Sequence, residues 1–366
     1  MMPSPKKEKF KGKILSALAG FISNFIVLVS RGELIKKFFW HFREKLEQKG
    51  EDYLTVHTRP KKAEAVGLWS DDIKAFKKNG LVLQGPVITE DDFTLETIRL
   101  YKKTFDHSVI ILSTWSDEKK EVLSRFEDEG IIVLLNEKPG IPGYGNINYQ
   151  IVSSSAGMLK AKELDADYVL KTRTDQRIYA PNVENYLWQL LDVFPVAPGY
   201  PQKKRILGVS LNSFKYRPYA LSDMTLFGDI EDMLLFWGVK LDDRPFVLRK
   251  DTTMQDWVRL KVAEGYLVTK FLAKLGRPTD WTVQNSWQMF AEHFCVIDQT
   301  SLDLYWPKYD RQREYRYWDY EGIRTCQALT FRDWLNLYKS WHTIGRVPEG
   351  VLEMSFSDIV AKEPSS

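Results

Sequence analysis

The chain has 366 residues, of which 44% are hydrophobic and 28% are charged, a composition typical of globular proteins rather than disordered or fibrous ones. At this length we expect about two compact units, large enough to bury a core without disulfides or structural metals. The two cysteines, Cys295 and Cys326, exclude a disulfide framework and a four-cysteine zinc site, and they favour a reducing compartment.

Basic residues are concentrated at the N-terminus, although the formal net charge is only +3. Residues 1–45 contain ten Lys and Arg against three Asp and Glu, which leaves 42 against 46 in the rest of the chain. This distribution argues against a protein coated for nucleic acid. It favours a short basic segment that contacts an anionic partner.

An apolar stretch at residues 14–29 lies inside this basic segment. As a helix it would rise about 24 Å, which is short of the roughly 30 Å hydrocarbon core of a bilayer. Its apolar side chains recur at steps of three and four along one stripe: Phe10, Ile14, Leu18, Phe21, Phe25 and Leu28. We therefore expect residues 1–45 to form a basic amphipathic segment on a membrane surface. A core helix is the structural alternative, and Asn24 together with charged residues 31–37 disfavours a secretory signal.

Residues 46–75 are polar and mixed in charge, which predicts a linker. From residue 76 to residue 300, short apolar runs alternate with helical patterns, as in α/β folds whose strands are buried on both faces. The predicted strands are 81–83, 109–112, 131–135, 167–172, 205–211, 224–228 and 294–297. The predicted helices begin at 89 and 116, span 146–164, follow an Asp229 cap, and span 261–275 before Gly276. We expect a doubly wound, mostly parallel sheet flanked by helices.

The C-terminal extension, residues 301–366, is rich in aromatic side chains. Residues 301–341 contain eleven aromatic residues and seven Lys or Arg. This composition favours a packed C-terminal cap over a flexible linker.

Ligands of doubly wound sheets bind beyond the carboxyl ends of the strands, where the chain leaves the sheet. The first two predicted strands end at residues 84–86 and 113–115, which include Gln84, Gly85 and Thr114. We expect these residues to contact a bound ligand, with Gln84 against a nucleotide base. Simple turn formation before Pro86 is the structural alternative.

The densest group of charges, residues 171–177, follows the fourth predicted strand. Lys171, Arg173 and Asp175 point to one side of an extended strand, and burying them without partners is costly. A phosphate and a divalent cation would satisfy all three, with Asp175 as an oxygen ligand of Mg²⁺ or Mn²⁺. A structural salt bridge is the alternative. The sequence contains no P-loop, dinucleotide-binding, zinc-protease or nucleophile-elbow motif.

Five segments together resemble one known family, the WavE lipopolysaccharide synthesis family. They are residues 81–87 (LVLQGPV), 146–157 (NINYQIVSSSAG), 168–179 (YVLKTRTDQRIY), 212–229 (NSFKYRPYALSDMTLFGD) and 302–310 (LDLYWPKYD). The resemblance covers roughly residues 80–310. It implies a bacterial glycosyltransferase of cell-surface polysaccharides, with a nucleotide-sugar-binding fold of the GT-A kind.

Enzymes of the GT-A kind usually hold a divalent metal with an Asp-x-Asp motif at the end of a strand. The matching residues here are Arg173, Thr174 and Asp175, so the resemblance implies a metal at Asp175 with arginine in place of one carboxylate. A cation of the protein can stabilise the departing nucleoside diphosphate instead of part of the metal charge. His293 or Asp298 can complete a metal site, although a lone histidine is more often structural.

Two further segments supply candidate donor-binding residues. Asn146 or Asn148 is expected to cap the helix beside the nucleotide, where serines and Gly157 either let a ribose approach or pack the helix tightly on the sheet. Lys215 and Arg217, on an aromatic loop, are suited to stacking a sugar and holding a phosphate. A solvated basic loop is the alternative.

An inverting transfer requires a carboxylate that takes the proton of the acceptor hydroxyl. Asp223, just before a predicted strand, and Glu264, in a predicted helix, are the candidates for a catalytic base. A turn cap and an exposed helix residue are their structural alternatives. A retaining enzyme would not need such a base.

The sequence thus predicts a peripheral glycosyltransferase at the cytoplasmic face of the bacterial inner membrane, with the cytoplasm as the alternative location. Its predicted partners are a nucleotide-sugar donor, a lipid-linked glycan acceptor and an anionic membrane surface, without nucleic acid. Two other classes stay open. One is a sugar-phosphate nucleotidyltransferase, which would carry a basic glycine-rich loop after the first strand. The other is a non-catalytic binding module of a polysaccharide assembly complex.

Overall fold

The computed structural model describes residues 16–25, 33–49, 59–63, 77–105, 107–244, 256, 258–259, 262–307 and 327–348. The chain divides into two compact units, residues 1–60 and 61–366. The first unit contains a helix at 16–25 and α2 (Glu33–Lys49). Phe10, Ile14 and Leu28 of the predicted stripe, and most of the predicted linker, lie outside the described residues. None of the described helices combines the length and apolar character that crossing a membrane requires.

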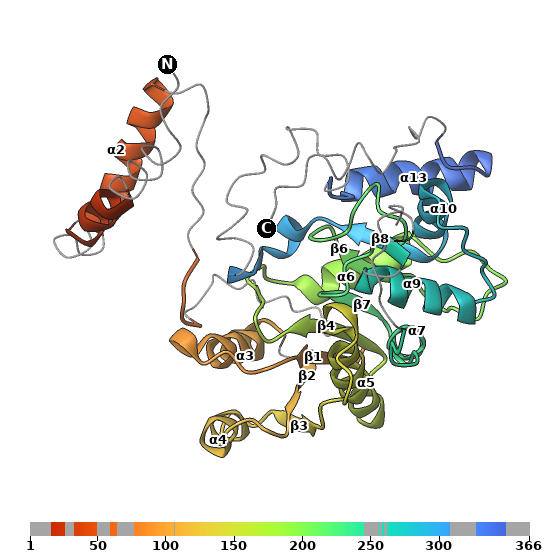
Figure 1. Cartoon of the computed structure of the whole chain (residues 1–366), viewed down its shortest axis with the longest axis horizontal. Coiled ribbons are helices and arrows are strands. Elements are labelled where there is room, and N and C mark those ends of the chain that lie inside the picture. The colour runs from red at the N-terminus through yellow and green to blue at the C-terminus, as the bar shows by residue number, and fades with distance from the viewer. Residues whose placement is uncertain are drawn as a thin grey trace. The chain divides into compact units, whose positions relative to one another are not determined.

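The second unit is built on a sheet of seven described strands in the order β3-β2-β1-β4-β7-β6-β8 (Figure 1). They are β1 (Asn79–Gln84), β2 (Ser108–Trp115), β3 (Ile132–Asn136), β4 (Tyr168–Arg173), β6 (Ile206–Val209), β7 (Leu226–Asp229) and β8 (Phe294–Ile297). β7 is antiparallel to β4 and β6, whereas the other neighbours in this sheet are parallel. The predicted doubly wound, mostly parallel sheet is confirmed.

Helices flank this sheet, and in Figure 1 α3 and α5 lie on opposite sides of β1. The described helices are α3 (Phe93–Thr104), α4 (Lys120–Glu127), α5 (Ile147–Glu163), α6 (Val183–Val193), α7 (Ile230–Trp237), α9 (Ala263–Lys274), α10 (Val283–His293) and α13 (Phe331–Ile344). Short 3₁₀ turns span Glu90–Asp92, Tyr144–Asn146 and Gln299–Leu302. A separate ribbon pairs β5 (Arg177–Ile178) with β9 (Leu304–Tyr305).

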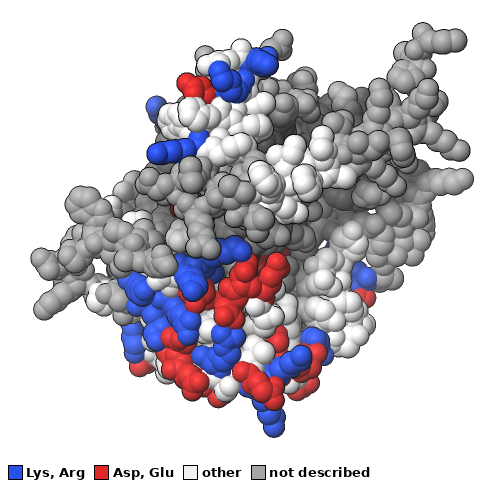
Figure 2. All heavy atoms as spheres, turned by 90° about the vertical axis from the view of Figure 1, so that its left-hand side faces the viewer, with Lys and Arg blue, Asp and Glu red and all other residues white. Residues whose placement is uncertain are grey.

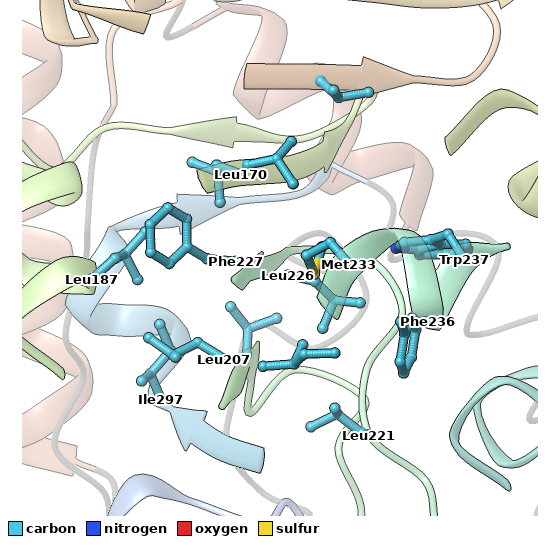
Figure 3. Close-up of a cluster of buried hydrophobic side chains, with 14 of the residues drawn as sticks. Leu170, Leu187, Leu207, Leu221, Leu226, Phe227, Met233, Phe236, Trp237 and Ile297 are labelled. Atoms are coloured by element: carbon cyan, nitrogen blue, oxygen red, sulfur yellow. The ribbon is translucent and has the colours of Figure 1, made fainter. Parts of the chain in front are cut away.

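The central strands are apolar on both faces because helices cover both. Every residue of β1 is buried. Leu170 of β4 lies opposite Phe227 of β7, and both belong to the buried cluster that Met233 and Trp237 of α7 extend (Figure 3). The described part of the C-terminal cap is packed as predicted, since the Trp334 indole of α13 is buried and donates to backbone carbonyls at the α10–β8 junction.

Helix ends follow the predicted signals only in part. Asp229 caps α7 by accepting from the Glu231 amide (2.9 Å), and Gly276 closes α9 with a φ of 72°. Thr89 was expected to cap a helix, but it makes no side-chain cap bond among the described residues, and α3 begins at Phe93 after a 3₁₀ turn. α4 begins at Lys120 rather than near 116.

Charges of both signs alternate on the surface around α3 and α4. Arg99 lies 2.6 Å from Glu129, and Arg125 lies 2.8 Å from Asp92. Figure 2 shows Lys and Arg intermixed with Asp and Glu on the face that it presents. Such exposed pairs contribute roughly 0–1 kcal/mol each. This face therefore does not present a field of a single sign.

Gly157 of α5 sets the distance between that helix and the sheet, because an added methyl group would overlap Val82 of β1. We expect Gly157→Ala to lower the free energy of unfolding by about 1–3 kcal/mol, as overpacked cores do. Chemical denaturation measures this change. Gly140→Ala is the control, since no described atom lies within 4 Å of its added methyl group, and it should change stability by less than about 0.5 kcal/mol. Equal stabilities of the two variants would contradict this packing.

Candidate functional site

The carboxyl ends of β1 and β4 are tied together by Thr174. In the parallel register Gln84 lies beside Arg173. The Thr174 amide donates to the Gln84 carbonyl (3.1 Å), and its hydroxyl donates to the Pro86 carbonyl (2.6 Å). Gly85 has a φ of 120°, and a β-carbon there would lie 3.0 Å from Thr174 Oγ1, so this turn requires glycine. The two chain exits thus form one rigid edge.

A row of hydrogen-bonded side chains continues this edge across β2 and β3. Asn136 Nδ2 donates to Ser113 Oγ (2.9 Å), which donates to the Ser153 carbonyl of α5 (2.7 Å). Ser153 Oγ in turn donates to Gln84 Oε1 (2.9 Å). Helix α5 therefore orients Gln84, the residue that was predicted to contact a nucleotide base. Thr114 is buried, and its hydroxyl donates to a Glu118 oxygen (3.2 Å) instead of extending the row.

Arg173 and Asp175 form a bidentate ion pair at the end of β4. Arg173 Nε lies 2.7 Å from Asp175 Oδ1, and Nη2 lies 2.9 Å from Oδ2. The Arg173 guanidinium also lies over the Trp306 ring, 5.1 Å from its centroid. Burial alone would raise the pKa of Asp175, but the hydrogen bonds and charge of Arg173 outweigh it and hold that pKa below its usual value. Because both side chains are 24% exposed, a ligand can reach the pair.

These residues do not fit a divalent cation held by Asp175. Both carboxylate oxygens already accept hydrogen bonds from Arg173, and a bound cation would lie beside the positive guanidinium. Within the described ranges, no group of three His, Cys, Asp or Glu side chains is arranged to hold a metal ion. Hard divalent cations usually take several oxygen ligands from the protein or from substrate phosphates. The arrangement is instead that of a charge-assisted, salt-bridged arginine.

The other two predicted metal ligands have structural partners. His293 is buried, its Nδ1 lies 2.8 Å from Gln202 Oε1, and burial lowers its pKa. It precedes β8 at the amino end of that strand, which is the sheet edge opposite to Asp175, because β8 is parallel to β6 and β6 to β4 through β7. Asp298 lies beyond the carboxyl end of β8, where it accepts a hydrogen bond from the Phe331 amide of α13 (3.1 Å).

The structure brings the two predicted catalytic carboxyl groups within electrostatic range of each other. Asp223 precedes β7 and is 3% exposed, and Glu264 lies in the first turn of α9. Burial and then the negative charge of Asp223 raise the pKa of Glu264 to about 8, against a smaller lowering by Arg217. This shift favours the protonated form of Glu264 at neutral pH. A carboxyl group whose pKa is raised beside a second carboxyl group is an arrangement that can divide acid and base roles.

Lys171 contacts the backbone of Asp223, one member of this carboxyl pair. It is fully buried, and its ammonium donates to the Asp223 carbonyl (2.5 Å) and lies 4.6 Å from the Trp237 ring centroid. Burial lowers the pKa of Lys171 to about 7, although the nearby Asp223 charge opposes this change. Lys171 thus shares a strand face with Arg173, as predicted, but the structure places it against the backbone of Asp223.

The two predicted asparagines take different positions at the start of α5. Asn148 is buried, and its Nδ2 donates to the Ile141 and Asp242 carbonyls (both 2.9 Å) while its Oδ1 accepts from the Asp242 amide (2.6 Å). Its polar groups therefore join two loops. Asn146 is exposed, has a φ of 61°, and makes no cap bond within the described part of the chain. The prediction that either side chain caps this helix is wrong.

Lys215 and Arg217, the two cations of the aromatic loop after β6, have different partners. Lys215 pairs with Asp333 of α13 (2.9 Å), which anchors the C-terminal cap. Arg217 lies over the Phe214 ring, 4.2 Å from its centroid, and its charge reaches Glu264. The structure therefore places Arg217, and not Lys215, near the carboxyl pair.

Two residues of the site received no specific role from the sequence. Thr174 was covered only as the middle of the Arg-Thr-Asp motif, and its function in joining two loops depends on β1 and β4 being neighbours. Trp306 lies in the segment 302–310, whose resemblance to a family was the available signal. Its position against Arg173 depends on the pairing of β9 with β5.

A hollow lies at the opposite edge of the sheet. It has a volume of about 490 Å³ and includes Lys77, Asp167, Lys203 and Asp229 in its lining. Lys203 and Asp229 are 3.7 Å apart, so these two charges compensate each other. It lies beyond the amino end of β4, whereas ligands of such sheets bind at the carboxyl ends. The charged edge around Arg173 remains the better candidate.

A family model described as WavE lipopolysaccharide synthesis matches residues 80–362. No curated protein matches the chain. Among solved structures, the chain is similar to a Bacillus anthracis protein described as a glucose-1-phosphate thymidylyltransferase, with 11% identity and a TM-score of 0.32 over 54% of this chain and 83% of that one. It is also similar to S. aureus TarS, with 12% identity and a TM-score of 0.32 over 59% and 39% of the two chains. Similarities at this level carry no inference about activity.

The buried Lys171 predicts a specific dependence of stability on pH. Its ordinary pKa is 10.5, and in the folded chain it is about 7. Between these values the unfolded chain binds the additional proton, so raising the pH favours the folded state. Relative to Lys171→Met, the free energy of unfolding of the wild type should rise by about 1 kcal/mol per pH unit from pH 7 to 10, and the difference should be constant below pH 7. Denaturation at each pH measures it, and parallel profiles would contradict the burial of a titrating amine.

Proposed function

The chain belongs to the WavE lipopolysaccharide synthesis family, and from this premise we propose that it is a glycosyltransferase, moving a sugar from a nucleotide-sugar donor to a lipid-linked surface glycan. The observation that carries the proposal is that a partly exposed Arg173–Asp175 pair and two neighbouring carboxyl groups, buried Asp223 and half-buried Glu264, lie at one sheet edge. Transfer needs a cation for the departing diphosphate and a base for the acceptor, and this edge offers both.

In this proposal the transfer inverts the sugar, and Asp223 is the base. The acceptor oxygen forms a bond to the sugar carbon while the bond from that carbon to the donor phosphate breaks. The acceptor proton passes to Asp223, and the nucleoside diphosphate leaves with the bonding electron pair. The raised pKa of Glu264 favours its protonated form at neutral pH, in which it donates a hydrogen bond instead of accepting a proton.

The donor side of the site would use the edge formed by β1 and β4. Gln84, oriented by Ser153, is the proposed hydrogen-bond partner of the nucleotide base of the donor. Gly85 lets the backbone approach the ligand closely. Arg173 and Arg217 are the proposed partners of the donor phosphates. Asn148 and Lys215 are left out because their polar groups hold other parts of the fold.

A panel of UDP-, GDP-, CDP- and dTDP-sugars tests the reaction class. A working transferase is expected to hydrolyse its own donor slowly, by transfer to water, and to bind the matching nucleoside diphosphate. Hydrolysis of one donor class would support the transferase. Binding of a nucleotide sugar without any turnover, in the presence of a lipid-linked glycan extract, would favour a non-catalytic binding module instead.

The proposed division of roles between the two carboxyl groups makes a sharp prediction. Asp223→Asn should lower the rate of transfer by about 10²–10⁴-fold, the usual contribution of a general base. Glu264→Gln, the matched change, should lower it by less than about tenfold, because glutamine keeps a neutral side chain that donates hydrogen bonds. Rates are measured with the donor identified by the panel. A large loss in Glu264→Gln and a small one in Asp223→Asn would reverse the assignment.

We also propose that unit 1 holds the enzyme on the cytoplasmic face of the bacterial inner membrane, where a lipid-linked acceptor is confined. On α2, four large apolar side chains are exposed on one side: Phe38, Phe39, Phe42 and Leu46. Leu18, Phe21 and Phe25 are exposed on the helix at 16–25. Apolar faces on a segment with an excess of Lys and Arg are typical of helices that lie in an anionic membrane interface.

Vesicle binding tests this membrane contact. Phe38→Ser with Phe42→Ser should weaken binding to vesicles containing phosphatidylglycerol by roughly tenfold or more, because two buried phenylalanines contribute roughly 1.5–3 kcal/mol each. His41→Ser is the control, since His41 is exposed and pairs with Glu44 on the polar side of α2. Binding that neutral vesicles support equally well, or that the double variant leaves unchanged, would contradict the proposal.

A further inference from the structure

We infer that the donor diphosphate is held by cations of the chain itself, with Arg173 as the main partner, and that Asp175 orients Arg173 instead of holding a metal. This inference rests on the proposed transferase function and names how its donor site recognises a diphosphate. It concerns the one position where the Asp-x-Asp pattern of GT-A enzymes is replaced by Arg173, Thr174 and Asp175.

The Arg173–Asp175 ion pair leaves a metal ion at this position with few available oxygen ligands. Asp175 uses both carboxylate oxygens on Arg173 at 2.7 and 2.9 Å. A divalent cation at Asp175 would have to compete with a guanidinium that is already in place, and it would lie next to that positive charge. The described residues also supply no cluster of three ligating side chains around it.

Arg173 is positioned as a phosphate ligand should be. Asp175 fixes the plane of the guanidinium through two bonds, and Trp306 lies against one face of it. A guanidinium binds phosphate oxygens with directed, charge-assisted hydrogen bonds. Its side chain is 24% exposed, so it lies at the surface of the site. A donor fixed in advance in this way loses little entropy on binding.

The other charges nearby have different tasks. Lys171, two residues earlier on the same strand face, is fully buried and bonded to the Asp223 carbonyl. Arg177, two residues after Asp175, is buried and donates to Thr97 Oγ1 (2.8 Å) and to the Phe93 carbonyl (2.8 Å). Of the three cations in residues 171–177, Arg173 is therefore the one that combines exposure with a fixed orientation.

The experiment is a calorimetric titration of the full chain with uridine, guanosine, cytidine and thymidine diphosphates, first in excess EDTA and then in Mn²⁺. At least one diphosphate should bind in EDTA with an affinity within about twofold of that in Mn²⁺. Arg173→Ala should weaken this binding by roughly tenfold or more, the range for a hydrogen bond to a charged group. Arg173→Lys keeps the positive charge but lacks the planar, paired N–H donors of the guanidinium. It should give an intermediate loss of affinity.

Asp175→Asn separates the two roles of the carboxylate. If Asp175 orients Arg173 and holds no metal, this variant should weaken binding less than Arg173→Ala does, and by the same factor in EDTA as in Mn²⁺, because the cation remains but its orientation is less fixed. Arg125→Ala is the control for loss of an arginine ion pair, since Arg125 pairs with Asp92 on the α3–α4 surface, and it should bind normally. Thermal unfolding of each variant confirms that it is folded.

Three results would overturn the inference. Binding that requires Mn²⁺ and is lost in Asp175→Asn would restore a metal site and leave the transferase function standing. Binding in EDTA that a folded Arg173→Ala retains at wild-type strength would remove Arg173 from the donor site. Absence of binding by all four diphosphates, with or without Mn²⁺, would overturn this inference and the proposed function together.

Discussion

The parallel pairing of β1 with β4 is the constraint on which the candidate site depends. It brings Gln84 beside Arg173, so that both chain exits leave the sheet at the same edge and Thr174 can join them. The antiparallel β7 then completes the site. Because β7 runs against β4, its amino end lies at that edge, with Leu226 opposite Lys171. Asp223, which lies three residues before the start of β7, is placed beside the end of β4 for this reason.

The basic side chains of the second unit differ in how deeply they are buried and in which groups compensate their charge. Lys171, Arg177 and Arg205 are almost fully buried, and each donates to backbone carbonyls, which compensate for lost hydration. Arg173 is compensated by a carboxylate and remains partly exposed. A buried cation bonded to main chain stabilises one local conformation, whereas a partly exposed cation held by a carboxylate can exchange partners with a bound anion. The same residue type thus serves the fold at one position and is available for chemistry at another.

Much of the fold could be predicted from the sequence, because continuous apolar runs and helical periodicity are local signals. The strands at 81–83, 109–112, 131–135 and 167–172 were predicted and are all present as β1 to β4. Helix starts were less predictable, since Thr89 and Asn146 have the residue types of caps but the chain turns before either can act as one. Partner choice was not predictable for Asn148 or Lys215, whose partners Asp242 and Asp333 are 94 and 118 residues away along the chain.

The alternation of buried strands with helices could be read from the order of residues, and so could the unusual set of charges at one strand end: Lys171, Arg173 and Asp175. Alternation of side chains along a strand is a local property, so it follows from residue order. How these charges are used depends on the packing of distant segments: Asp175 binds Arg173, Lys171 donates to the Asp223 carbonyl, and Glu264 of α9 comes within electrostatic range of Asp223. These relations depend on strand order and helix packing, which join residues distant in sequence, and on burial, which changes the protonation of a carboxyl group that the sequence presents as ordinary.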